Sequence, residues 1–322
     1  MSPVSIPAEQ RYYLKQKALY YFYEKDYSYS DIAKMLSISR VTLNRLMTEA
    51  KAEGMIKIEI ADPKDLKQVL VLEDQLRSRY GLKDVKLVDL SNYDSDNLIP
   101  RLASEGAKYV EQRIHSGMKI GICWGHTLSS MLTFLNRNHT VTNLEVYSLL
   151  GGFCSEASFQ PPLLAQSLLS LYSGRAYTIN APFVCHSHLL CTEIRKEPEI
   201  ARILDICPSL DLALIGVGQY PDRDRLEKSY YHFPDSVIDE LLAAHAVGDI
   251  CGNFFDASGA VCRTDLSNRI VSVDLQNLKK CKNVIAIAGG PSKIDSIRGA
   301  LSGGYIHTLI SDVKTAEGLL AV

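Results

Sequence analysis

Two helices joined by a tight turn are predicted within residues 28–60, and no other stretch constrains the fold of this chain as strongly. Apolar residues recur at helical spacing on both sides of the turn at residues 37–38, namely Ile32, Ala33 and Leu36 before it and Leu43, Leu46 and Met47 after it. Ser30 and Ser39 stand where the helices would begin, and a serine oxygen there accepts a hydrogen bond from a free backbone N–H group. The pattern therefore predicts a helix-turn-helix, with helices at about 30–36 and from about residue 39.

Side chains that suit DNA lie on the second predicted helix: Ser39, Arg40, Val41, Thr42, Asn44 and Arg45. Arginine bonds guanine through two donors, asparagine does the same with adenine, and serine or threonine suits a phosphate or a base. In a helix-turn-helix the second helix enters the major groove of double-stranded DNA. We therefore predict contacts with an operator, chiefly from Arg40 and Arg45; the alternative is an ordinary surface hairpin with solvated charges.

The flanks of this unit extend the prediction. Residues 12–25 read as a preceding helix, and residues 55–60 alternate as a short strand, which would give a winged variant of the motif. We assign residues 1–61 to a DNA-binding domain. A helix with a broad apolar stripe is predicted at 64–80; it either folds back on its own domain or pairs with a second copy, and we favour pairing because recognition helices usually work as dimers. Residues 62–82 are therefore a linker and oligomerisation helix.

The net charge of the chain and the length of its apolar runs limit which partners it can have. The chain carries a net charge of −2, while its first 60 residues hold nine Lys and Arg against seven Asp and Glu. So slight a positive excess suggests that DNA affinity depends on a homo-oligomer, a dimer or tetramer, that presents several reading helices. No apolar stretch follows Met1 and no run approaches about 18 apolar residues, so we expect a cytoplasmic protein without a signal peptide or membrane span.

The eight cysteines are scattered and form no Cys-x-x-Cys pair. In a cytosolic protein such cysteines read as small, reduced core residues. A zinc site near Cys185 and Cys191, with His186 and His188, is the alternative, but the spacing fits no common ligand set. We therefore predict neither a metal nor a cofactor.

From residue 84 onward short apolar strands alternate with amphipathic helices. Strands are predicted at 85–90, 119–124, 144–150, 176–179, 212–217, 284–288 and 308–310, with helices among them at 97–114, 127–135 and 162–172. This alternation predicts a Rossmann-like, mostly parallel α/β domain over residues 83–322, with helices on both faces of the sheet. In such sheets ligands bind beyond the carboxyl ends of the strands.

Glycine-bearing turns follow four of these strands: Gly125-His126-Thr127, Gly151-Gly152, Gly216-Val217-Gly218, and Gly289-Gly290 with Lys293 close behind. Glycine lets a backbone approach an anion, and a helix N-terminus offers free N–H groups. The set predicts a phosphate-bearing ligand, although no turn matches a dinucleotide or nucleotide-phosphate motif. The alternative is that each glycine only makes a tight turn.

Three aspartates have separate predicted roles. Asp249, held by a glycine-flanked turn, is our candidate acceptor for ligand hydroxyls. Asp256 is expected in a turn with Gly259, bonding nearby backbone. Asp312 is expected to cap the helix at 313–320.

The order of elements and six segments resemble the SorC family of sugar-responsive transcriptional regulators. The segments are DIAKMLSISRVTLNRL at 31–46, IGICWGHTL at 120–128, LLGG at 149–152, DLALIGVG at 211–218, VGDICGNFFDASG at 247–259 and VIAIAGGPSKIDSIRGALSGGYIHTLISD at 284–312. The resemblance implies a C-terminal domain similar to glucosamine-6-phosphate deaminase and ribose-5-phosphate isomerase, converted into a sensor of phosphorylated sugars. It also implies tetramers and operator binding.

By this resemblance Gly125, His126 and Thr127 lie in a phosphate-proximal loop that faces Gly151 and Gly152. Asp249 meets sugar hydroxyls, and the anion site is completed by Gly289, Gly290 and Lys293. Segment 182–195 has no assigned contact. Two alternatives remain beside the regulator: an active sugar-phosphate isomerase or deaminase, with Asp249 and His126 as acid and base, and a plain oligomeric DNA-binding protein. We expect a regulator of a carbohydrate operon and no catalytic activity.

Overall fold

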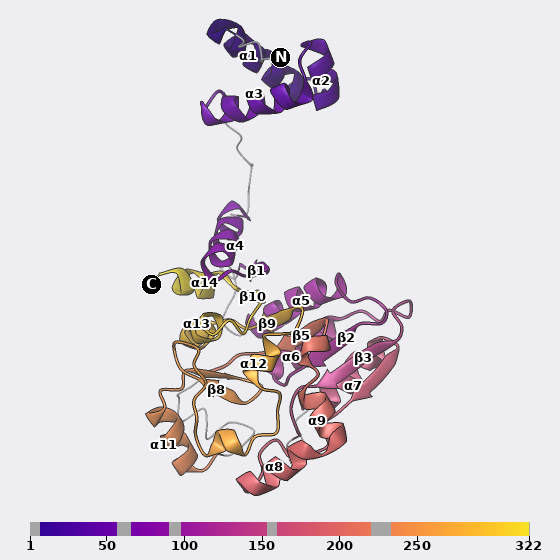
Figure 1. The fold of residues 1–322 in the computed structure, drawn as a ribbon, viewed down its shortest axis with the longest axis vertical. Helices are drawn as coiled ribbons and strands as arrows, with labels where there is room; N and C mark the ends of the chain where they lie inside the picture. Colours follow the sequence, from indigo (N-terminus) through magenta and orange to yellow (C-terminus); the bar gives the residue numbers. More distant parts are fainter. Residues whose placement is uncertain (1–6, 57–65, 90–97, 153–159, 220–232, 322) are drawn as a thin grey trace. The chain divides into compact units, whose positions relative to one another are not determined.

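The computed structural model describes residues 7–56, 66–89, 98–152, 160–219 and 233–321. The chain divides into two compact units, Met1–Lys64 and Asp65–Val322. Figure 1 shows helices α1 (Ala8–Tyr23), α2 (Tyr29–Met35) and α3 (Arg40–Ala52) in the first unit and a sheet flanked by helices in the second.

The first unit consists of α1, α2 and α3. The predicted apolar stripes meet in its small core, which includes Ala18, Ile32, Ala33, Leu43 and Met47. The guanidinium of Arg11 pairs with Glu49, and the buried Lys15 pairs with Glu53. These ion pairs tie α1 to the back of α3, so the helix-turn-helix rests on a third helix.

Serine caps start both helices of the motif, but one prediction was wrong. Ser39 caps α3 as expected, because its Oγ accepts a hydrogen bond from the Thr42 N–H at 3.0 Å. The helix α2 is capped by Ser28, whose Oγ accepts from the Asp31 N–H, and not by Ser30. The reason is that α2 begins at Tyr29, which places Ser30 inside its first turn. Of the predicted strand at 55–60, Met55 and Ile56 form no strand, and the remainder lies outside the described residues.

The second unit is built on a seven-stranded sheet of order β1-β10-β9-β5-β2-β3-β4, in which every neighbouring pair is parallel. Its strands are β1 (Asp84–Val88), β2 (Lys119–Ile122), β3 (Leu144–Ser148), β4 (Gly174–Tyr177), β5 (Leu212–Ile215), β9 (Val284–Ile287) and β10 (Thr308–Asp312). The residues of β5 and β9 are all buried, as expected when helices cover both faces. The predicted parallel α/β fold is confirmed.

Helices follow the strands along the chain. Their bounds are α5 (Leu98–Glu111), α6 (His126–Phe134), α7 (Pro161–Leu171), α8 (His188–Lys196), α9 (Pro198–Leu204), α11 (Asp235–Ala243), α12 (Leu275–Leu278), α13 (Ile294–Ser302) and α14 (Val313–Leu320). Helix α5 packs on β1, β9 and β10, whereas α7 packs on β2, β3 and β4. As predicted, Asp312 caps α14 by accepting from the Thr315 N–H at 2.9 Å.

A second, antiparallel sheet was not predicted. It consists of β6 (Gly218–Gln219), β7 (Gly248–Ile250) and β8 (Asn253–Phe255), in the order β6-β7-β8. Strands of two or three residues are too short to show an alternating pattern. This small sheet positions Asp249 directly opposite Gly218.

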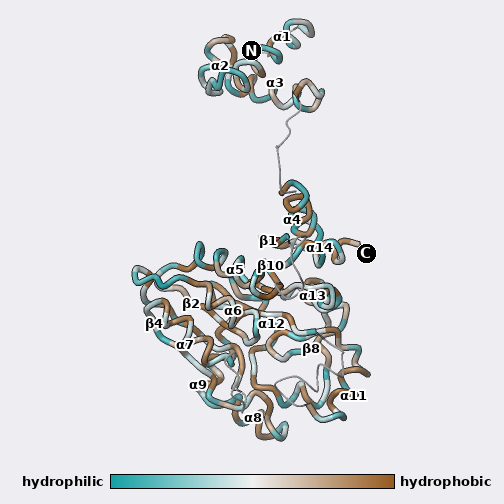
Figure 2. Tube along the Cα trace, turned by 180° about the vertical axis from the view of Figure 1, so that it is seen from behind, coloured by the Kyte–Doolittle hydropathy of each residue, from teal (hydrophilic) through white to brown (hydrophobic). Residues whose placement is uncertain are grey.

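The helix predicted at 64–80 is α4 (Leu66–Tyr80), and it belongs to the second unit. Val69 and Leu76 join the core of the α/β unit, and the Tyr80 hydroxyl donates to the Leu319 carbonyl at 3.1 Å. Val69 and Leu76 are thus buried within the second unit itself. Leu66 and Leu70 stay exposed, and the hydrophobic residues of α4 appear brown in Figure 2. Pairing through those two residues stays a prediction.

Candidate functional site

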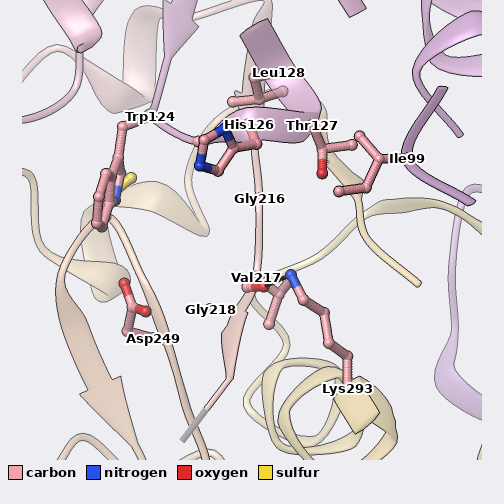
Figure 3. A pocket seen from close by; sticks show the side chains of 12 residues that line it. Ile99, Trp124, His126, Thr127, Leu128, Gly216, Val217, Gly218, Asp249 and Lys293 are labelled. Carbon is pink, nitrogen blue, oxygen red and sulfur yellow. Dashed lines mark hydrogen bonds between the residues drawn. The ribbon is translucent and has the colours of Figure 1, made fainter. Parts of the chain in front are cut away.

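A cavity of about 270 Å³ opens where β2 and β5 end. Figure 3 shows side chains from α6, from the small sheet and from the segment just before α13 pointing into it. Its lining residues are Ile99, Trp124, Gly125, His126, Thr127, Leu128, Gly216, Val217, Gly218, Asp249, Cys251 and Lys293. The position agrees with the rule that ligands bind at the carboxyl ends of parallel strands.

Five predicted ligand residues meet in this cavity: Gly125, His126, Thr127, Asp249 and Lys293. Gly125 is the residue before α6, and its φ of 131° is a conformation that side-chain-bearing residues rarely adopt. The first N–H groups of α6 have no partner within the helix. This end of the cavity can therefore receive an anion.

The two glycine pairs predicted beside them do not line the cavity. Gly151 donates its N–H to the Val271 carbonyl and Gly152 donates to the Ala181 carbonyl, both at 2.9 Å. The Gly290 N–H donates to Asp312 Oδ2 and Thr315 Oγ1, both at 2.7 Å. At Gly289 a Cβ atom would lie 2.4 Å from Asp312 Oδ2. These four glycines therefore lie beside the cavity lining and make contacts within the protein, and their contact with a ligand stays a prediction.

Asp249 is the buried acid of the site, with only 6% of its surface exposed. One carboxylate oxygen accepts the Gly252 N–H at 3.0 Å. Burial raises the pKa of Asp249 to about 6, while the Gly252 hydrogen bond and the charge of Lys293 act in the opposite direction. The carboxyl group thus changes charge near neutral pH and can accept or donate a hydrogen bond to a hydroxyl.

Lys293 brings positive charge to the opposite side of the cavity. It ends the short 3-10 helix η4 (Pro291–Lys293), and its Nζ donates to the Val217 carbonyl at 2.7 Å. Burial, and then the charge of Lys293, lower the pKa of His126. His126 is therefore mostly neutral at pH 7, and Lys293 supplies the cationic charge.

Apolar lining residues escaped the sequence analysis. Trp124, Ile99, Leu128 and Val217 form walls around the polar groups. Trp124 is the single tryptophan and directly precedes Gly125, a signal that could have placed it in the site. Its ring lies 6.2 Å from that of Phe183, so the unassigned segment 182–195 supports this wall from behind.

The rest of that segment has structural contacts. Arg195 donates to the backbone carbonyls of Ile270 and Ser272 at 3.1 and 3.0 Å.

Within the described ranges, no group of three or more His, Cys, Asp or Glu residues could hold a metal ion. None of the helices in the described parts of the chain is long and apolar enough to cross a membrane.

The predicted DNA-contacting residues lie at the start and along one side of α3. Arg40, Val41, Asn44 and Arg45 are exposed, and Val41 keeps 82% of its surface accessible. The hydroxyl groups of Ser39 and Thr42 bond each other at 2.8 Å within the cap, and their contact with DNA stays a prediction. Arg40 also donates to Ser30 Oγ of α2. The exposed set presents donors and a methyl-bearing side chain, which suits base edges.

Comparison with known proteins supports both units. Residues 64–321 match Sugar-bind, a sugar-binding domain, and residues 15–69 match a Crp-like helix-turn-helix domain. The chain is 31% identical over 300 residues to the deoxyribonucleoside regulator of Bacillus subtilis (strain 168), covering 93% of this chain and 94% of that protein. It is 28% identical over 302 residues to the sorbitol operon regulator of Klebsiella pneumoniae, covering 93% of this chain and 95% of the regulator.

Solved structures agree. The full-length sorbitol operon regulator SorC from Klebsiella pneumoniae superposes with a TM-score of 0.72 at 27% identity, over 97% of this chain and 100% of that one. These relatives are named as transcriptional regulators and not as enzymes. With its helix-turn-helix and its sugar-binding domain, the chain belongs to the SorC family of sugar-responsive transcriptional regulators.

Proposed function

We propose that a small phosphorylated sugar, or a sugar-like phosphate, binds in the cavity and controls the affinity of α3 for operator DNA. The observation that carries the proposal is the convergence of Lys293, the N-terminus of α6 and Asp249 on one cavity. The regulated genes would serve carbohydrate uptake or catabolism, as the name of the Klebsiella relative suggests. The protein would act in the cytoplasm as a homo-oligomer.

The phosphate would occupy the end of the cavity formed by α6 and Lys293. Gly125 gives access to the N-terminal N–H groups of α6, and Thr127 adds a hydroxyl donor in its first turn. Lys293 adds a full positive charge, and hydrogen bonds to charged groups contribute about 1.5–3 kcal/mol each. These groups favour a phosphate over a neutral sugar end.

Sugar hydroxyls would meet Asp249, which lies opposite and deeper. The cavity of about 270 Å³ lies just below the range of roughly 300–1,000 Å³ that ligand pockets usually have. A monosaccharide phosphate suits that volume better than a disaccharide or a nucleotide. Trp124 offers an apolar surface to the carbon-bearing face of the ring.

Control of DNA binding requires that the ligand prefer one arrangement of subunits. Reading helices bind two half-sites at a fixed spacing, so a change in their separation changes operator affinity. Because α4 is packed into the α/β unit, the segment that joins the two units ends at a helix of the sugar-binding unit. Ligand binding would then be coupled to DNA binding through α4.

Thermal-shift measurements with a panel of sugar phosphates and their matched free sugars test the proposal. A ligand at 100 times its Kd stabilises the folded chain by about 2.7 kcal/mol. We expect a phosphorylated sugar to raise Tm and its free sugar to have little effect. A Tm increase with free sugars alone would contradict the proposal that the ligand is phosphorylated. If no ligand that raises Tm changes operator binding, the proposal that the ligand controls DNA affinity would be wrong.

A further inference from the structure

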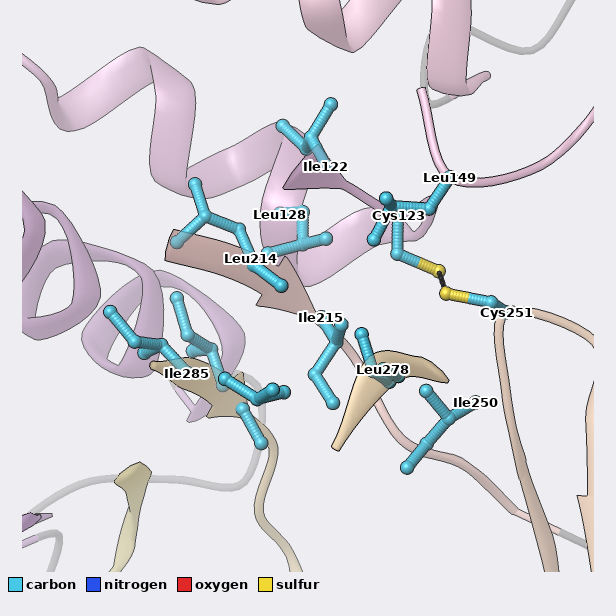
Figure 4. Packing of buried hydrophobic residues seen from close by; sticks show 14 of the residues in the cluster. Ile122, Cys123, Leu128, Leu149, Leu214, Ile215, Ile250, Cys251, Leu278 and Ile285 are labelled. Carbon is cyan, nitrogen blue, oxygen red and sulfur yellow. Dashed lines mark hydrogen bonds between the residues drawn. The ribbon is translucent and has the colours of Figure 1, made fainter. Parts of the chain in front are cut away.

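Two cysteine sulfurs meet in the wall of the cavity. The Cys251 S–H donates to Cys123 Sγ at 2.9 Å, although the residues are 128 positions apart in the chain. Figure 4 shows the pair among the buried hydrophobic residues that end β2 and β7. Both thiols are 1% exposed, and both are reduced in this structure. Their separation is within about 1 Å of an S–S bond, whose length is about 2 Å.

The two cysteines come from two different segments beside the cavity, and Cys251 is among its lining residues. Cys123 directly precedes Trp124, in the loop that leads into α6. Cys251 lies in the turn between β7 and β8 and itself lines the cavity. The next residue, Gly252, donates to the carboxylate of Asp249. A bond between the sulfurs would therefore join the Trp124 loop to the turn that holds Asp249.

We propose that Cys123 and Cys251 are a modification site: a peroxide converts them to a reversible disulfide that stiffens both segments beside the cavity. Only the regulatory meaning of this stiffening rests on the proposed function, since the bond needs no sugar and no DNA to form. The site thus adds an oxidation response to a ligand sensor.

The chemistry balances with one molecule of hydrogen peroxide. Cys251, which is the one of the two that lines the cavity, reacts first: its sulfur takes one peroxide oxygen, the O–O bond breaks, and sulfenic acid and water form. Cys123 Sγ then attacks the sulfenic sulfur, the S–O bond breaks, and a second water leaves with the thiol proton. Two thiols lose two electrons and two protons in total, and a dithiol reductant reverses the change.

Burial raises the pKa of Cys251 far above that of a free thiol, so little thiolate is present at pH 7. The pair therefore stays reduced in an ordinary reducing cytosol and reacts only when peroxide is abundant. Its proximity makes the second step, closure of the disulfide, fast compared with further oxidation of Cys251.

The experiment uses the full reduced chain, treated with hydrogen peroxide and then unfolded in urea with N-ethylmaleimide, so that every buried free thiol is alkylated. Peptide mapping by mass spectrometry should find residues 123 and 251 joined, with the loss of two hydrogens, and dithiothreitol should separate them. Cys123→Ser and Cys251→Ser should abolish the bond. Cys262→Ser is the matched control, because Cys262 is a buried thiol that bonds the Ala244 carbonyl. A wild-type chain in which both residues stay alkylatable overturns the proposal.

Stiffening has its own readout. Hydrogen–deuterium exchange of the backbone at residues 124–128 and 249–253 should slow at least severalfold on oxidation in the wild-type chain and in Cys262→Ser, and not in Cys251→Ser. A disulfide that forms without slowing exchange in either loop overturns the link to the cavity. Neither measurement depends on a sugar phosphate, so failure of the proposed ligand would not be mistaken for failure of the cysteine pair.

Discussion

A Cβ atom on Gly218 would lie 1.8 Å from Oδ1 of Asp249, because these two residues pair directly across β6 and β7. No side chain larger than hydrogen fits beside the carboxylate in its present position. Gly218 is therefore required by its partner strand and not by its own turn. The absence of a side chain at Gly218 lets the buried carboxylate of Asp249 lie at the cavity wall.

Gly218→Ala is therefore expected to displace Asp249. Overpacking of this kind typically costs about 1–3 kcal/mol, and ligand binding should weaken with it. The matched control is Gly216→Ala, since a Cβ there meets its nearest atom at an ordinary 3.7 Å. Urea denaturation and ligand titration of both variants make the comparison. Equal behaviour of the two alanine variants would show that the carboxylate moves without cost.

The pKa of Asp249 predicts a dependence of stability on pH. Its folded pKa of about 6 lies above the ordinary value of 3.8, so the folded chain binds this proton more tightly than the unfolded chain does. Stability contributed by Asp249 is therefore complete below about pH 4 and is lost as pH rises through 6. At one pKa unit per 1.4 kcal/mol, the loss is roughly 3 kcal/mol.

Asp249→Asn should remove the pH-dependent stability that Asp249 contributes, while keeping an acceptor for the Gly252 N–H. We compare the free energy of unfolding of the variant and the parent by urea denaturation at pH 4.5 and at pH 7.5. The variant should become more stable relative to the parent as the pH rises from 4.5 to 7.5. His126 and His307, whose pKa values are lowered by burial, add an opposite trend as pH falls. That trend is common to both proteins and cancels in the difference. A difference that does not vary with pH would contradict the raised pKa.

Arg40→Ala should weaken operator binding and leave the ligand cavity unchanged. Loss of a bidentate base contact costs about 1–3 kcal/mol, or roughly 5- to 150-fold in Kd. Lys34→Ala, which removes the same charge from the exposed surface of α2, is the control. Fluorescence anisotropy with an operator selected by the parent protein gives the affinities. An effect of Lys34→Ala as large as that of Arg40→Ala would indicate general charge attraction instead.

Lys293→Met should give a DNA-binding protein that no longer responds to its ligand. Removing one charge-assisted contact should raise the ligand Kd about 10- to 100-fold. Lys280→Met removes an equal charge from an exposed residue whose amine bonds Asn277. Titration calorimetry of the three proteins with the ligand found in the thermal-shift panel makes the test. A normal Kd for Lys293→Met would place the phosphate elsewhere.

The parallel sheet could be predicted from the sequence because its central strands are short, buried apolar runs that alternate with helices along the chain. The strands β5 and β9 are examples, with every residue buried. The antiparallel β6-β7-β8 sheet could not, since pairing of Gly218 with Asp249 joins segments 31 positions apart through strands too short for a pattern.

The same contrast holds inside the site. Gly125 and Lys293 were recognised from local signals, a helix start and a glycine-rich turn. Gly151 and Gly290 carry the same local signals, but their N–H groups bond Val271 and Asp312 from distant parts of the chain. Local sequence cannot distinguish an N–H group that faces a ligand from one that faces another segment. Long-range hydrogen bonds decide which glycine turn lines the cavity.

The packing of α4 has a consequence for how such proteins diversify. Because Val69 and Leu76 are part of the α/β core, a crossover between two genes near residue 64 would exchange whole DNA-reading units without cutting a packed helix. The sugar-binding unit would keep its core, its cavity and helix α4. A chain of this design can acquire a new target sequence in one recombination step while it keeps the same ligand.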